Sequence, residues 1–383
     1  MIKVAIVSGL LPSGHYTENL CLGLNKIKKI KVSIYTDKDP NNLKVKKCGK
    51  IRLVWSKTPL YIFQILAQLM KDQPDIVHLQ HEINMFGSLS TAILFPFLIL
   101  FARMGGARVV TTVHATVKQS QIDDNFVRTF NKNPKYIKPI YLKLFFKYLY
   151  RSICVLSNSC VVHTKTAKKV LSSYSRTSTQ KIIVIPTAIP YVKQLNLKKK
   201  NYFLYFGYIA RRKGLESLIK GFRKFCLRNP QSRFNLWLAG GVIKGQEESL
   251  RELKKIIVDS KLGHKVKYLG FLERSKQKKL YRESYGVVIP AKISISASGP
   301  LYHAFSHGKF IIASKIGHLK DEIKNNYNGV LTQNIKWFSA FEKAVKNPQW
   351  VKQIEQNAQK TAKQRSPKLT AFKYLNLYQS LDT

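Results

Sequence analysis

Acidic residues are scarce in this chain. Its 383 residues include 20 Asp and Glu against 66 Lys and Arg, which gives a formal net charge of +46 at pH 7. Such an excess predicts attraction to the phosphates of a nucleotide, an anionic lipid or a nucleic acid, although a lysine-rich composition without any such partner is an alternative. The charge is scattered along the chain, and no recognition-helix, zinc or RNA-binding signature accompanies it. We therefore expect no nucleic-acid partner.

Cysteine is also scarce. The five cysteines are an odd number and include no Cys-x-x-Cys pair, which argues against a disulfide framework or a zinc site and fits a reducing cytoplasm. No cluster of residues has the spacing of metal ligands either, so the sequence indicates no metal cofactor.

Long apolar runs are a third absence. The first apolar segment, residues 1–9, is too short for a signal peptide and is typical of a first β-strand. Residues 85–102 are more apolar, but they barely reach the length of a membrane span and Pro96 interrupts them. We expect a helix there that is buried or lies against a membrane, and not one that crosses it.

Short apolar runs alternate with longer helical patterns along the whole chain. This alternation is typical of parallel sheets that carry helices on both faces. The chain also exceeds the usual size of one hydrophobic core. We therefore predict an α/β protein with two doubly wound domains, and strands at 4–8, 31–35, 51–55, 76–79, 108–113, 160–163 and 182–185, then at 202–207, 234–239, 266–269, 286–289, 310–313 and 329–332.

Helices are expected near 15–28, 59–72, 85–104, 138–156 and 164–174, then near 214–228, 246–261, 275–284, 299–307, 319–325 and 335–346. Residues 191–200 contain a charge run without periodicity, and we predict that they link a domain of residues 1–190 to a domain of residues 201–346. The polar helices expected in 347–383 either stay with the second domain or pack back on the first.

A basic turn follows the first strand of the second half. Residues 203–214 read Phe-Leu-Tyr-Phe-Gly-Tyr-Ile-Ala-Arg-Arg-Lys-Gly, with three consecutive cations just before a helix. Backbone N–H groups at a helix N-terminus can bind a diphosphate together with the side chains of Arg211, Arg212 and Lys213. A solvated basic surface is the alternative, which this turn alone does not exclude.

Loops after other strands contain further candidates, because ligands of open α/β sheets bind beyond the carboxyl ends of the strands. Gly14 follows the first strand, His81 and Glu82 follow the fourth, and His114 follows the fifth. A histidine at a strand end can donate to a sugar hydroxyl or stabilise a developing charge, whereas a buried or capping histidine does neither.

Glycine-containing segments of the second half occur in a characteristic order. They are Leu238–Gly241, Tyr268–Leu272, Ser296–Ala304, Gly308–Ser314, Gly317–Ile323 and Asn328–Gly329. With the basic turn, this order and spacing resemble the retaining GT-B glycosyltransferases of family four, the glycosyl transferases group 1. The resemblance covers nearly the whole chain and is strongest over residues 202–332.

The resemblance implies a GT-B fold, in which two Rossmann-like domains enclose a cleft, and a nucleotide-diphosphate sugar as donor. The basic turn would bind the diphosphate, the Gly270 turn would border the nucleobase, and His114 would lie near the transferred sugar. The segment Gln80-His-Glu82 looks like an acceptor-side loop of one branch. The implied catalytic residues are His114, Arg212 and Lys213, the donor-binding residues are Gly14, Arg211, Gly270, Phe271, Leu272, Ser298, Gly299, Pro300, Leu301 and His303, and the acceptor-binding residues are His81 and Glu82.

One element departs from the family pattern. The Glu-x7-Glu element of the family falls on Ile295 and His303, so both carboxylates are missing. In relatives the first lies near the donor sugar and the second commonly grips the ribose. His303 can hydrogen-bond a ribose hydroxyl, or it can lie on a helix surface without a ligand. The departure predicts altered donor choice or slower turnover.

Lysine and aromatic residues interleave over residues 135–151, with cations at Lys143, Lys147 and Arg151, one per helical turn. Such a helix can lie on an anionic bilayer, with its aromatic rings at headgroup depth. A surface helix whose apolar side faces the core is the alternative. Relatives that act on lipid-linked acceptors use a basic, apolar patch on the N-terminal domain, which favours membrane docking.

The resulting hypothesis is a retaining hexosyltransferase that moves a sugar from a nucleotide-diphosphate sugar to a lipid-linked or polysaccharide acceptor. We expect it in the cytoplasm, bound peripherally to the inner face of the membrane. The alternative is a catalytically weak GT-B scaffold that binds anionic lipid or polymer, which the missing carboxylates and the basic charge favour.

Overall fold

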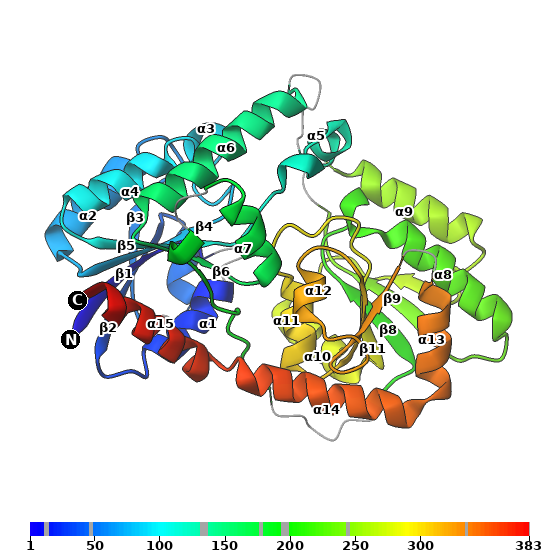
Figure 1. The fold of residues 1–383 in the computed structure, drawn as a ribbon. Coiled ribbons are helices and arrows are strands. Elements are labelled where there is room, and N and C mark those ends of the chain that lie inside the picture. Colours follow the sequence, from blue (N-terminus) through cyan, green and yellow to red (C-terminus); the bar gives the residue numbers. More distant parts are fainter. Residues whose placement is uncertain are drawn as a thin grey trace.

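Two parallel β-sheets, each covered by helices, form the protein (Figure 1). This computed structural model describes residues 1–10, 15–45, 49–130, 137–175, 179–192, 199–242, 246–333 and 336–382. The expectation of two doubly wound α/β domains is confirmed, and every strand predicted from the sequence is present with its ends within two residues of the predicted ones.

The first sheet has strand order β3-β2-β1-β4-β5-β6-β7, and all neighbouring strands are parallel. Successive residues of a strand point to opposite faces. In β1, Ala5 and Val7 lie in one core, and Val4 and Ile6 lie in the other. The strands are β1 (Ile2–Val7), β2 (Ile30–Asp37), β3 (Lys50–Trp55), β4 (Ile76–His81), β5 (Arg108–Val113), β6 (Ser159–Val162) and β7 (Ile182–Val184).

Helices α2, α4, α6 and α7 cover one face of this sheet, and α1 and α15 cover the other (Figure 1). The single helix expected over 85–104 is two, because Pro96 fits the first turn of α4 but cannot continue a helix that begins earlier. The helices of this part are α1 (His15–Leu24), α2 (Tyr61–Asp72), α3 (Leu89–Ala92), α4 (Phe95–Met104), α5 (Asp124–Phe130), α6 (Pro139–Leu156) and α7 (Lys165–Ser172).

The second sheet has strand order β10-β9-β8-β11-β12-β13 and is also parallel. Its strands are β8 (Tyr202–Phe206), β9 (Asn235–Ala239), β10 (Val266–Tyr268), β11 (Gly286–Ile289), β12 (Phe310–Ser314) and β13 (Val330–Thr332). Its helices are α8 (Leu215–Arg228), α9 (Glu248–Asp259), α10 (Arg274–Glu283), α11 (Gly299–Ser306), α12 (Leu319–Glu322), α13 (Trp337–Lys346) and α14 (Pro348–Gln364).

The chain crosses between the two sheets twice. The first crossing follows β7, and residues 193–198 of the predicted linker lie outside the described residues. The second follows α14, after which α15 (Pro367–Asp382) packs on α1 of the first domain, and both chain ends lie on that domain (Figure 1). The crossings touch, since Ile189 N–H donates to the Arg365 carbonyl over 2.7 Å. Across the described residues, we find no helix that is both long enough and apolar enough to span a membrane.

Candidate active site

The basic turn lies at the carboxyl end of β8. Residues Arg211–Lys213 form one turn of 3-10 helix, and Gly214 then adopts a left-handed conformation, φ +68°, from which α8 begins. A Cβ at Gly214 would lie 1.8 Å from the Pro290 carbonyl oxygen, so only glycine allows this turn to lie so close to the end of β11. The Lys292 N–H donates to the Arg212 carbonyl over 2.8 Å and fixes the turn there.

The three cations of the turn have different surroundings. Arg211 is exposed and forms an ion pair with Glu252 of α9. Arg212 and Lys213 are half-buried and form no ion pair with described residues. Burial and the neighbouring Arg212 lower the pKa of Lys213 to about 8, so Lys213 remains largely protonated at pH 7. Both cations are partly desolvated and lack an ion pair with a described residue. An anion bound between them would therefore stabilise their positive charges.

The predicted nucleobase turn is exposed. Gly270 has φ +68°, and Phe271 after it is 80% exposed. Gly240 at the end of β9 donates its N–H to the Gly270 carbonyl over 2.8 Å, which joins the two loops. The exposed ring of Phe271 lies beside Gly241, and a flat ligand could stack on it or contact its edge.

Helix α11 begins beside the strand end of β8. Ser298 caps it by accepting from the Leu301 N–H over 3.4 Å, and Pro300 occupies its first turn. A Cβ at Gly207 would lie 3.8 Å from the Pro300 ring, so the first turn of α11 and the loop after β8 are neighbours. His303 is half-buried and its ring lies 5.6 Å from that of Tyr281 on α10. The structure thus gathers the predicted phosphate-side segments at one edge of the sheet, whereas Gly14 lies outside the described residues.

The two residues predicted to bind the acceptor lie at the end of β4. His81 is buried, and its ring lies 4.6 Å from that of Phe95. Neither of its ring nitrogens has a hydrogen-bond partner among the residues that the structure describes. Burial lowers the pKa of His81 to about 4. Glu82 is half-buried, and burial raises the pKa of its carboxyl group while the positive charge of Arg212 lowers it. The acceptor-side carboxylate therefore lies within electrostatic reach of the basic turn of the other domain.

His114 lies at the end of β5, as expected, but its imidazole has no free nitrogen. Its Nε2 is 2.8 Å from the Gln80 amide and its Nδ1 is 3.1 Å from His163 Nε2. Burial lowers the pKa of His114 well below its usual range, and neighbouring histidines lower it further. A neutral ring with both nitrogens occupied is not positioned to exchange a proton with a substrate.

The loop that carries Ile295 reaches across to the first domain. Ala115 and Ser296 form an antiparallel bridge, and the Thr116 N–H donates to the Ile295 carbonyl over 2.8 Å. The Tyr16 hydroxyl of α1 donates to the Ala297 carbonyl over 3.0 Å. The segment that lacks the family's first carboxylate is thus held by backbone and tyrosine contacts from the opposite domain.

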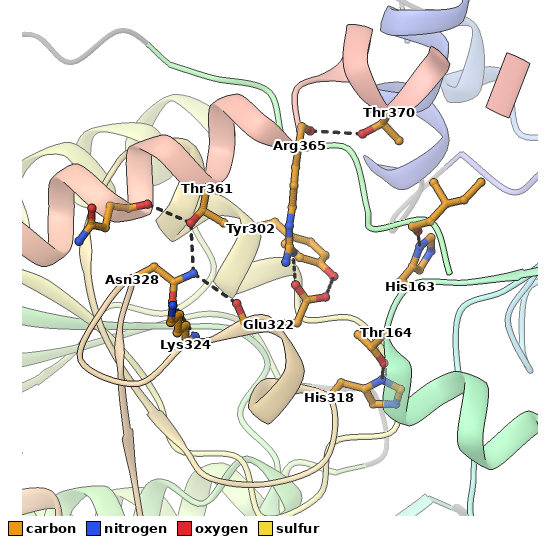
Figure 2. A network of polar contacts seen from close by, with 12 residues as sticks. His163, Thr164, Tyr302, His318, Glu322, Lys324, Asn328, Thr361, Arg365 and Thr370 are labelled. Carbon is orange, nitrogen blue, oxygen red and sulfur yellow. Dashed lines mark hydrogen bonds and ion pairs between the residues drawn. The ribbon is translucent and has the colours of Figure 1, made fainter. Parts of the chain in front are cut away.

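A buried carboxylate that is not among the predicted site residues lies on α12. Glu322 of α12 accepts from the Tyr302 hydroxyl over 2.8 Å and forms an ion pair with Arg365 at the second crossing (Figure 2). Nearby, Thr164 of the first domain lies 2.8 Å from His318 Nδ1 of the second (Figure 2). These contacts join elements that are far apart in the sequence, and no local pattern in the sequence indicates them.

A cavity of about 720 Å³ lies between α5 of the first domain and α8 and α9 of the second. Its lining includes Arg128 of α5 and Arg212 of the basic turn, and Arg212 lies over the Phe130 ring at 5.4 Å. Helix α5 was not expected from the sequence, yet it forms one wall of this cavity. The described residues contain no group of three His, Cys, Asp or Glu side chains that could hold a metal ion.

Two family models match adjacent parts of this chain. Glycosyltransferase Family 4 matches residues 13–191, and Glycosyl transferases group 1 matches residues 190–361. The O-antigen chain mannosyltransferase RfbU of Salmonella typhimurium is 23% identical over 301 residues, which cover 77% of this chain and 80% of that protein. The uncharacterized glycosyltransferase MJ1607 of Methanocaldococcus jannaschii is 30% identical over 190 residues, which cover 45% of this chain and 46% of that protein.

Solved structures share the fold over the whole chain. Anabaena Alr3699/HepE in complex with UDP is similar with a TM-score of 0.73 and 14% identity, covering 99% of this chain and 100% of that chain. A glycosyltransferase from Rickettsia africae gives a TM-score of 0.74 and 18% identity, covering 99% of this chain and 98% of that chain. With two adjoining family matches over residues 13–361, this chain belongs to the GT-B glycosyltransferases of family four, the glycosyl transferases group 1.

Proposed function

We propose that this chain transfers a sugar, with retention of configuration, from a nucleotide-diphosphate sugar to a lipid-linked or polysaccharide acceptor. The observation that carries the proposal is the basic turn, where Arg212 and Lys213 are half-buried cations without an ion pair among the described residues. A donor diphosphate would supply the missing negative charge, with the exposed Arg211 at its edge. Phe271 and the first turn of α11 would contact the base and the phosphates.

The chemistry follows from where the charge develops. The bond between the anomeric carbon and the phosphate oxygen breaks, a bond from the acceptor oxygen to that carbon forms on the same face, and the acceptor proton passes to the leaving phosphate oxygen. Arg212 and Lys213 would stabilise the diphosphate as its negative charge grows. The missing carboxylates at positions 295 and 303 do not prevent this step, because the phosphate accepts the proton.

Relatives support the choice of substrates. RfbU is named as an O-antigen chain mannosyltransferase, and HepE has been solved with UDP and with UDP-glucose. On the acceptor side, Glu82 and the unpaired ring of His81 would receive the acceptor hydroxyl, since both lie at the end of β4.

Donor binding is tested by thermal denaturation with UDP, GDP, ADP and their common sugar conjugates at moderate salt. A nucleotide at a hundred times its Kd should stabilise the protein by about 2.7 kcal/mol. We expect one nucleotide to give a selective shift, and Lys213→Ala to weaken its binding at least tenfold. Lys220→Ala is the matched control, because Lys220 is an exposed lysine of α8 that pairs with Glu216.

Equal shifts with all nucleotides, or none, would favour the alternative of a catalytically weak scaffold that binds anionic lipid or polymer. Unchanged affinity of Lys213→Ala would contradict the assignment of the diphosphate to the basic turn. With the donor known, retention is tested by comparing the anomeric configuration of the product with that of the donor by NMR.

We also propose that the enzyme works at an anionic membrane surface, in the cytoplasm. The outward face of α6 is apolar, with Ile140, Tyr141 and Leu144 more than half exposed, and it includes the exposed cations Lys147 and Arg151. The neighbouring helix α4 adds further exposed apolar side chains, namely Phe97, Leu100, Phe101 and Met104. An apolar face of this extent with flanking cations is typical of helices that lie in a lipid headgroup layer.

Sedimentation with vesicles tests this surface. The protein should bind vesicles that contain phosphatidylglycerol more strongly than phosphatidylcholine vesicles, and the binding should weaken at high salt. The double variant Leu144→Glu, Phe101→Glu should lose most of the binding. The control Leu227→Glu, Val258→Glu changes two apolar residues of the second domain that are more exposed than Leu144 and Phe101, and it should bind as before. Equal binding of both double variants would exclude this face as the docking surface.

A further inference from the structure

A continuous series of hydrogen-bonded side chains crosses the interior of the first domain. It begins on α15, where the Tyr378 hydroxyl lies 2.7 Å from His78 Nδ1. The side-chain nitrogen of Gln80 lies 2.9 Å from His78 Nε2, and its oxygen lies 2.8 Å from His114 Nε2. The Thr112 hydroxyl also lies 2.7 Å from His78 Nε2. His114 Nδ1 then lies 3.1 Å from His163 Nε2, and His163 Nδ1 lies 2.9 Å from the Ile185 carbonyl oxygen. All six side chains are buried.

Burial keeps the three rings of this series neutral. It lowers the pKa of His78 to about 3 and lowers the pKa of His163 and His114 as well. A neutral imidazole has one donor and one acceptor nitrogen, so the proton positions follow from one fixed end. The Ile185 carbonyl only accepts, and His163 must therefore donate to it from Nδ1 and accept at Nε2.

The remaining protons follow in order. His114 donates from Nδ1 to His163, so its Nε2 can only accept. The Gln80 amide must therefore be turned over, so that its N–H and not its oxygen faces His114 Nε2. Gln80 then presents its oxygen to His78 Nε2–H, and His78 Nδ1 accepts from the Tyr378 hydroxyl. Each donor has an acceptor, with every bond pointing the same way from α15 to Ile185. The partners thus fix both the tautomer of His114 and the orientation of the Gln80 amide.

The fixed ring of His114 supports Tyr16. The two ring centroids lie 4.8 Å apart with an interplanar angle of 32°, and the His163 ring lies 6.0 Å from Tyr16. The Tyr16 hydroxyl donates to Ala297 in the loop that bridges to Ala115. Position 295 of this loop is isoleucine, so the loop contains no carboxylate of its own to anchor it at the site.

We propose that Tyr16 is a positioning residue, which rests on the His114–His163 pair and holds the loop 295–297 in place for sugar transfer. His114 acts through Tyr16 and exchanges no proton with the substrate. The inference rests on the proposed transferase function. It assigns a role to Tyr16 and His163, neither of which is among the predicted site residues, and it gives His114 a supporting role in place of a catalytic one.

Tyr16→Phe tests the contact because it removes only the hydroxyl and keeps the ring. Hydrogen–deuterium exchange should become faster in peptides that contain the Thr116 amide, whose N–H is bonded to Ile295. The rate of nucleotide release from the bound donor, with water as acceptor, should fall about 10- to 100-fold with donor Kd unchanged, because the loop is misplaced. Tyr285→Phe is the control, since its hydroxyl donates to the Ala344 carbonyl within the second domain.

Unchanged exchange, or unchanged turnover despite faster exchange, in Tyr16→Phe would overturn the proposal. If the unmodified protein binds no nucleotide sugar, the transferase function fails, and the exchange data still decide whether Tyr16 holds the loop. NMR of protein labelled with ¹⁵N-histidine checks the support. His114 should be the neutral Nδ1–H tautomer from pH 6 to 8, and its tautomer should change in His163→Phe. A His114 that titrates in this range would also overturn the proposal.

Discussion

The surroundings of His81 are poorly suited to its charged form. Its ring lies against Phe95, and neither nitrogen has a partner among the described residues. The folded state therefore holds a neutral imidazole, with a pKa of about 4, where the unfolded chain has a histidine of pKa about 6.5. Between these two values the unfolded chain binds a proton that the folded protein does not.

This difference predicts a loss of stability in acid. The contribution of His81 is fully present above pH 6.5 and is lost as the pH falls toward 4. At pH 5 the loss is about 2 kcal/mol. We expect His81→Phe to reduce the drop in unfolding free energy between pH 7.5 and pH 5 by roughly this amount, measured by urea denaturation. The same replacement at the exposed His264 should not change the drop, and an unchanged drop in His81→Phe would contradict the prediction.

Single residues were predictable where their chemistry follows from a strand end. The basic turn, His81, Glu82 and His114 all occupy the carboxyl ends of strands, which the alternation of strands and helices predicts. Their contacts were not predictable, because the partner is distant in sequence, as Glu252 is for Arg211 and Ala297 is for Tyr16. The strand-end rule also selects His163, yet only the fold brings its ring to His114.

At the scale of elements, the contact of α1 with α15 depends on Gly23. A Cβ at this position would lie 2.0 Å from the Pro367 carbonyl oxygen and 2.7 Å from the Ala371 Cβ. Alanine favours a helix over glycine by about 1 kcal/mol, but here the clash with the backbone of α15 outweighs that gain.

Gly23→Ala is therefore expected to destabilise the protein, by about 1–3 kcal/mol in urea denaturation. Gly263→Ala is the comparison, because nothing lies within 4 Å of a Cβ there and the backbone is not left-handed. If Gly23→Ala were as stable as the unmodified protein, or more stable, α15 would have to move away from α1 without loss of free energy. That result would contradict the close packing of the two helices.

Elements with a strong hydrophobic periodicity were predicted well. Elements whose presence or position depends on tertiary contacts were not. The strand positions follow from short apolar runs, and β5 and β11 have the predicted ends. Helix α5, which forms one wall of the cavity, contains only seven residues, so its pattern is too short to identify. The position of α15 depends on its packing with α1. The sequence therefore did not decide whether this segment stays with the second domain or packs on the first.

At the scale of the molecule, Glu322 and Arg365 join the second domain to the crossing between domains (Figure 2). Both side chains are largely buried, so removing one partner leaves an unpaired charge. We expect Glu322→Gln to lower the free energy of unfolding by about 3–5 kcal/mol. The double variant Glu322→Leu, Arg365→Met removes both buried charges of this pair. Its loss of unfolding free energy should be smaller than the sum of the losses in the single variants Glu322→Leu and Arg365→Met.

A double-mutant cycle in urea provides this comparison. Additive losses would mean that the pair contributes no coupling across the crossing. The two doubly wound domains were predictable from the alternation of strands and helices, and the GT-B architecture was predictable from the resemblance to the family. The closed contact between Ala115 and Ser296 was not, since it joins two loops 181 residues apart.

The return of α15 to the first domain also bears on synthesis of the protein. The second domain is an insertion between two parts of the first, because the chain leaves the first domain after β7 and re-enters it after α14. The core around α1 includes Tyr374, Leu377 and Tyr378 of α15, which the ribosome makes after the whole second domain. We therefore expect the second domain to reach its native fold on the ribosome first, while the face of the earlier-made sheet that α1 and α15 cover together remains incomplete until α15 is made.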